Sequence, residues 1–158
     1  MENFAAYLND HLAGAVGALE HLDHLVKTCQ DRELEAFFRS LRLEIEVDQA
    51  TLKKLIGDLG EKESAVRQAG AWITEKFSRV QLGPPGEMGL FLSLETLVLG
   101  ITGKEKLWSA LAAAAERMPQ LRGLDYPHLQ ARARAQAAQV EGKRLELARV
   151  VLGAQGKG

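Results

Sequence analysis

Four long segments of the chain place apolar residues at alternating steps of four and three. They run from about Asn3 to Thr28, Glu33 to Gly60, Glu87 to Arg117 and Asp125 to Leu152. In the second segment the repeated positions are Leu34, Phe38, Leu41, Ile45, Leu52, Leu55 and Leu59. Such spacing keeps one stripe of an α-helix facing its neighbours. The pattern therefore predicts four long helices and no strand.

The connections between these segments predict how the helices are arranged. Short links join the first helix to the second and the third to the fourth, so each pair should be antiparallel. About 26 residues separate the second helix from the third, which is enough to return along the bundle. Within them, residues 64–80 have an amphipathic pattern that predicts a short extra helix. The predicted fold is all-α, a ferritin-like four-helix bundle with a long crossover that carries this helix.

Three stretches of the sequence also resemble a known family. They are Tyr7-Leu8-Asn9-Asp10-His11-Leu12-Ala13-Gly14, Glu44-Ile45-Glu46-Val47-Asp48, and Leu94-Glu95 with Gly100-Ile101-Thr102-Gly103-Lys104. Together they are similar to an uncharacterised bacterial family of the ferritin-like superfamily, over nearly the whole chain. That family has no established activity, so the resemblance implies the fold and a bacterial origin but no reaction.

Length and composition fit a single globular domain, predicted over residues 1–152 with a flexible tail at 153–158. The net charge of -1 gives no electrostatic reason to expect a nucleic acid or an acidic membrane as a partner. No stretch reaches the roughly 18 apolar residues that suggest a membrane span. Cys29 is the only cysteine, which excludes an intrachain disulfide and favours a cytoplasmic location.

Charged residues interrupt the apolar stripes. Asp48 stands where the second helix calls for an apolar residue, and Glu44 lies one turn before it on the same face. Lys104 interrupts the stripe of the third helix, and Arg144 lies close to that of the fourth. Because buried charges require partners, these residues predict a layer of ion pairs inside the bundle. Gly100 and Gly103, beside Lys104, are predicted to allow close helix packing.

The same positions do not fit a metal centre. Ferritin-like di-metal sites need a carboxylate from each of two helices and Glu-x-x-His from each of the other two. One candidate carboxylate per helix is present: Glu20, Glu44, Glu95 and Glu141. No Glu-x-x-His occurs, because Val47 follows Glu44 by three residues and Arg144 follows Glu141. We therefore predict no metal, no cofactor and no catalytic residue. The predicted polar core residues are His11, Glu44, Asp48, Glu95, Lys104, Glu141 and Arg144.

The histidines of the first helix have different predicted surroundings. His11 borders the apolar stripe, and three roles stay open for it. They are a hydrogen bond to Asp48 or Glu44, a lone metal ligand, and a general acid or base in a polar pocket. His21 and His24 fall on the far side of the helix, where the pattern predicts contact with water.

Three functions remain open from the sequence. The first is a non-enzymatic helical bundle that acts as a structural or interaction module, as a homodimer or with an unknown protein partner. The second is a metal-binding oxidoreductase or storage protein that uses the four glutamates. The third is a small-molecule-binding or hydrolase-like site around His11, Glu44, Asp48 and Lys104.

Overall fold

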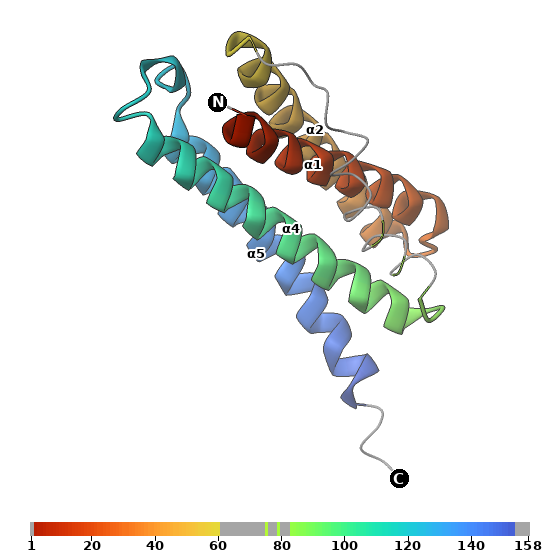
Figure 1. Ribbon diagram of the computed structural model, residues 1–158. Coiled ribbons are helices and arrows are strands. Elements are labelled where there is room, and N and C mark those ends of the chain that lie inside the picture. Colours follow the sequence, from red (N-terminus) through yellow and green to blue (C-terminus); the bar gives the residue numbers. More distant parts are fainter. Residues whose placement is uncertain (1, 61–74, 76–78, 80–82, 154–158) are drawn as a thin grey trace.

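Four long helices form a bundle in the computed structural model, which describes residues 2–60, 75, 79 and 83–153 (Figure 1). They are α1 (Glu2–Thr28), α2 (Arg32–Asp58), α4 (Glu87–Ala114) and α5 (Tyr126–Val151), with a short 3-10 turn at Pro119–Leu121. The third and fourth helices predicted from the sequence are thus α4 and α5. The predicted extra helix over 64–80 lies, apart from Glu75 and Arg79, outside the described residues. The all-α bundle is confirmed.

The helices are connected as the link lengths predict. Figure 1 shows α1 antiparallel to α2 and α4 antiparallel to α5, while α2 and α4 run in the same direction. The end of α2 and the start of α4 therefore lie at opposite ends of the bundle. Two antiparallel hairpins, α1–α2 and α4–α5, are packed together, with α1 against α4.

Side chains satisfy backbone groups at three of the described helix ends. The Asp31 carboxylate accepts a hydrogen bond from the Leu34 amide at 2.8 Å, and Asp125 does the same for the His128 amide at 3.0 Å. The sequence predicts that α4 extends to Arg117, but it ends at Ala114. Just beyond this end, the guanidinium of Arg122 folds back and donates to the carbonyl oxygens of Ala115 and Glu116 at 2.9 and 3.0 Å, which satisfies two carbonyls that the helix leaves open.

The predicted apolar stripes meet in the core. The most deeply buried large side chains are Trp108, Phe38, Leu8, Leu12, Leu22, Leu41, Ile56, Leu94, Leu97, Leu107, Leu111 and Leu121. In α1 the buried face is wider than one stripe, because Ala13, Gly17 and His21 form a second buried row four residues apart. His21 is 0% exposed, so the prediction that it contacts water is wrong. Its partly buried neighbour His24 stacks on it at a ring distance of 6.5 Å.

Glycines in α4 have unequal roles. A methyl group at Gly100 or Gly103 would meet nothing within 4 Å, so the predicted close packing at these two positions is wrong in the described part of the chain. At Gly89, by contrast, a methyl carbon would lie 2.1 Å from the backbone oxygen of Pro84. Gly89 therefore allows the Gly83–Gly86 turn to lie directly against the first turn of α4.

Replacing Gly89 with alanine should lower the free energy of unfolding by about 1–3 kcal/mol, because the Pro84 backbone must move to make room. Gly100→Ala is the matched control in the same helix. It should be neutral or stabilising by up to about 1 kcal/mol, because alanine favours the helix and meets no neighbour. Urea titration of both variants measures the difference. Equal stabilities for the two variants would contradict the close approach at Gly89.

Candidate functional site

Asp48 is the centre of a buried polar cluster. Its side chain is 4% exposed, as the interrupted stripe of α2 predicts. Lys104 of α4 donates to Oδ2 at 2.5 Å, and the Gln136 amide of α5 donates to the same oxygen at 3.1 Å. Arg132 of α5 donates to Oδ1 from Nε at 3.2 Å. The Asp48 carboxylate is thus bonded through both of its oxygens, and its partners come from two other helices, α4 and α5.

Gln136 connects the rest of this cluster. Its side-chain oxygen accepts a hydrogen bond from Lys104 Nζ, and its Nε2 donates to Glu44 Oε2 at 3.1 Å. Arg132 also reaches the backbone oxygen of Glu44, with Nη2 at 3.3 Å. We refer to these five residues, Glu44, Asp48, Lys104, Arg132 and Gln136, as the ion-pair layer.

The charges in the ion-pair layer balance, because two carboxylates face one ammonium and one guanidinium. The Lys104 side chain is only 15% exposed. Burial lowers the pKa of Lys104 below its ordinary value, and this outweighs the opposite effect of the Asp48 carboxylate, while the charge of Arg132 lowers the pKa further. The hydrogen bonds and the neutralisation thus offset only part of the cost of desolvating Lys104.

The other predicted core charges form a separate cluster between α4 and α5. The Arg144 guanidinium binds both carboxylate oxygens of Glu141, at 2.7 and 2.8 Å, and donates to Glu95 at 3.0 Å. It also lies over the ring of Phe91, 5.5 Å from the ring centre. The bond to Arg144 lowers the pKa of Glu141. The three predicted residues are therefore brought together, but at the partly exposed edge of the bundle.

His11 lies apart from both clusters. Its ring packs edge-on against Tyr7, with 4.8 Å between the ring centres. Among the described residues, a hydrogen bond from His11 to Asp48 or Glu44, one of the three roles left open for it, is not found. Burial lowers the pKa of His11, and the charge of Asp10 partly opposes this effect.

The four candidate metal ligands are not brought together. Glu44 belongs to the ion-pair layer, while Glu95 and Glu141 bind Arg144, and Glu20 is exposed on α1. Within residues 2–60 and 83–153, no three His, Cys, Asp or Glu side chains form a group that could hold a metal ion. The donor geometry thus fits ion pairs between side chains rather than a di-metal centre.

Two members of the ion-pair layer were not predicted as site residues. Gln136 occupies a position of the α5 stripe, so it carries the same signal as Asp48, a polar residue where an apolar one is expected. Arg132 lies four residues earlier and is therefore a neighbour of Gln136 on the surface of α5. The sequence could have indicated Gln136, whereas Arg132 resembles an ordinary surface arginine until α2 is placed beside it.

A large groove lies elsewhere, at the end of the bundle where α1 meets α2. It has a volume of about 990 Å³, and its lining includes neither His11 nor Lys104. It therefore gives no support to a small-molecule site around these two residues.

Comparison with known proteins assigns no family to this chain: no family model, curated protein or solved structure matches it.

Proposed function

We propose that this protein is a non-enzymatic, ferritin-like helical bundle that acts as a structural or interaction module, with the ion-pair layer in place of a metal site. The observation that carries the proposal is the bonding of Asp48. Its two oxygens accept hydrogen bonds from Lys104 and Arg132, two fixed cations that would repel a metal ion.

The connectivity supports the ferritin-like part of this proposal. Parallel α2 and α4 helices, joined by a long connection between two antiparallel hairpins, are the arrangement of ferritin-like bundles. The absence of a second cysteine suits the reducing cytoplasm, which is the location we propose.

The ion-pair layer has a structural role in this proposal, which is to fix how the helices align. Polar links join α2 to α5 at several heights, through Asp48–Arg132, Glu44–Gln136 and Glu33–Lys143. Lys104 adds a link from α4 to α2. Helices with similar heptad repeats can slide past one another, and a slide of one turn would leave these buried charges without partners.

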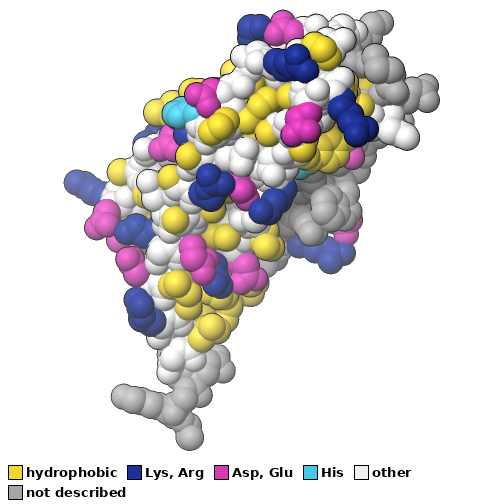
Figure 2. Space-filling view, turned by 90° about the vertical axis from the view of Figure 1, so that its left-hand side faces the viewer, with side chains coloured by type: hydrophobic (Ala, Val, Ile, Leu, Met, Phe, Trp, Pro, Cys, Tyr) yellow, Lys and Arg dark blue, Asp and Glu magenta, His cyan; other side chains and the backbone are white. Residues whose placement is uncertain are grey.

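Surface features support a role in protein interaction. Leu43 and Val47 lie one turn apart on α2 and are 62% and 58% exposed, and Leu99 of α4 is equally open to solvent. On the face drawn in Figure 2, basic and acidic side chains are interspersed and no large basic patch is seen. This face therefore offers no electrostatic site for a nucleic acid. No described helix is long and apolar enough to cross a membrane.

Metal analysis tests the proposal directly. Protein purified without chelator should contain far less than one iron or manganese ion per chain, because the carboxylates are neutralised by Lys104, Arg132 and Arg144. Added Fe²⁺ or Mn²⁺ should leave the melting temperature unchanged. About two such ions per chain, or a melting temperature that rises with added metal, would instead favour the oxidoreductase or storage function.

A further inference from the structure

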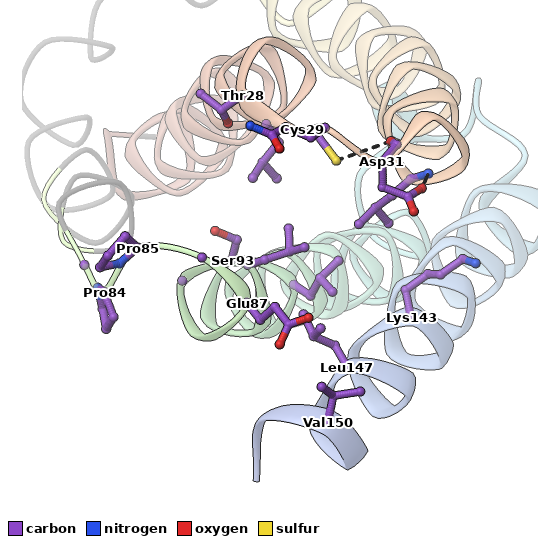
Figure 3. A pocket seen from close by; sticks show the side chains of 18 of the residues that line it. Thr28, Cys29, Asp31, Pro84, Pro85, Glu87, Ser93, Lys143, Leu147 and Val150 are labelled. Atoms are coloured by element: carbon purple, nitrogen blue, oxygen red, sulfur yellow. Dashed lines mark hydrogen bonds between the residues drawn. The ribbon is translucent and has the colours of Figure 1, made fainter. Parts of the chain in front are cut away.

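The groove at the end of the bundle is formed by all four long helices. It lies between the end of α1 and start of α2 on one side and the start of α4 and end of α5 on the other. In Figure 3, Thr28 and Cys29 border it from the first hairpin, while Ser93, Leu147 and Val150 approach from the second. Its volume of about 990 Å³ is at the upper end for small-molecule pockets and leaves room for several large side chains.

The lining of the groove is mixed, and its apolar part comes from all four long helices. Leu25, Leu34, Leu90, Leu94 and Leu147 contribute to it from the four helices. Val150, near the end of α5, is 52% exposed at its edge. Figure 1 shows that the end of α5 extends beyond the start of α4, and Leu152 there is also exposed. Val150 and Leu152 thus add exposed apolar side chains near the end of α5.

The rim of the groove is acidic. Asp31, Glu33, Glu87 and Glu146 lie on it and are all exposed. Lys143 is the basic residue among the described lining, and it is already bonded to Glu33 at 3.1 Å and to Glu146 at 3.7 Å. Among the described lining residues, four carboxylates and one lysine therefore lie above a floor of leucines.

We propose that this groove is a docking site for a basic amphipathic helix of another protein. Such a helix places apolar residues three and four positions apart into the groove, and its flanking lysines or arginines face the acidic rim. Opposite charge across the rim speeds association and selects basic over acidic partners. This inference rests on the proposed role as an interaction module and names the chemical class of its partner.

A synthetic peptide tests the proposal with the full chain. The probe is a fluorescein-labelled helix of about four turns, made of leucine on one face and lysine elsewhere. By anisotropy it should bind at least about tenfold more tightly than the same peptide with glutamate for lysine. Cys29, the only cysteine, lines the groove, so bound peptide should also slow its alkylation severalfold.

Matched variants locate the binding. Glu146→Lys on the rim and Val150→Asp at the apolar edge should each weaken binding by about tenfold. Glu116→Lys makes the same charge change at the opposite end of α4 and should leave the affinity unchanged. Equal affinities for Glu146→Lys and Glu116→Lys, or a Cys29 that alkylates equally fast with bound peptide, would overturn the proposal.

Two other occupants are separate outcomes of the experiment. If Cys29 resists alkylation until the protein is unfolded, the groove is already filled by the chain itself, and the proposal is overturned. If the protein is a dimer that Glu146→Lys dissociates, a second copy fills the groove, and the proposal is overturned in the same way. Neither result affects the metal content of the protein. The metal analysis therefore remains an independent test of the proposal that the bundle has no metal site.

Discussion

Replacing Lys104 with methionine should lower the free energy of unfolding by about 3–5 kcal/mol. Methionine keeps most of the apolar length of lysine, so the loss reports the missing charge rather than a cavity. Asp48 would stay 4% exposed with one of its two cations gone. Because Arg132 still donates to Oδ1, we expect a value towards the lower end of this range. Chemical denaturation at neutral pH measures the effect.

Two further variants distinguish the effect of losing the ion pair on stability from the effect of any lysine substitution in α4. Lys106→Met removes a lysine two residues away that is exposed and bonds to Glu105, so its denaturation curve should match that of the parent. Asp48→Asn combined with Lys104→Met should recover much of the lost stability, because no buried charge is then left uncompensated. A Lys104→Met protein as stable as the parent would refute the buried ion pair between Lys104 and Asp48.

Acidification should destabilise the protein through His21. Burial, together with repulsion from His24, lowers the pKa of His21 from the ordinary value of 6.5 to about 4. The unfolded chain therefore takes up a proton at a higher pH than the folded chain does. The stability that follows from this difference is fully present above pH 6.5 and is lost as the pH falls towards 4. At about 1.4 kcal/mol per tenfold change in proton affinity, the loss is roughly 3 kcal/mol.

His21→Phe should remove this part of the pH dependence. The quantity to compare is the change in unfolding free energy between pH 7 and pH 4, since the substitution can also alter stability at neutral pH. The change should be smaller in His21→Phe than in the parent by roughly 3 kcal/mol. His128→Gln, at an exposed position of α5, should retain the full dependence of the parent. An undiminished pH dependence in His21→Phe would show that His21 is not the responsible group.

The heptad spacing was sufficient to predict the helices because each helix must bury one continuous stripe. The stripe of α2 predicted both its buried leucines and the burial of Asp48, and the long connection after Gly60 predicted that α2 and α4 run in the same direction. The same reasoning was wrong for His21, because the pattern of one helix does not show how wide its covered face is. That width depends on which neighbours pack against the row of Ala13, Gly17 and His21.

The sequence by itself determined that charges would be buried, since Asp48 and Lys104 interrupt apolar stripes on different helices. Which charges pair was decided only by the tertiary structure. Asp48 meets Lys104 and Arg132 across 56 and 84 residues of chain, whereas Arg144 is directed instead to Glu95 and Glu141. Periodicity fixes the face on which a side chain lies, but not the height or the neighbour that it reaches. Those depend on how two hairpins align, and an ion pair forms only where that alignment brings opposite charges within about 4 Å.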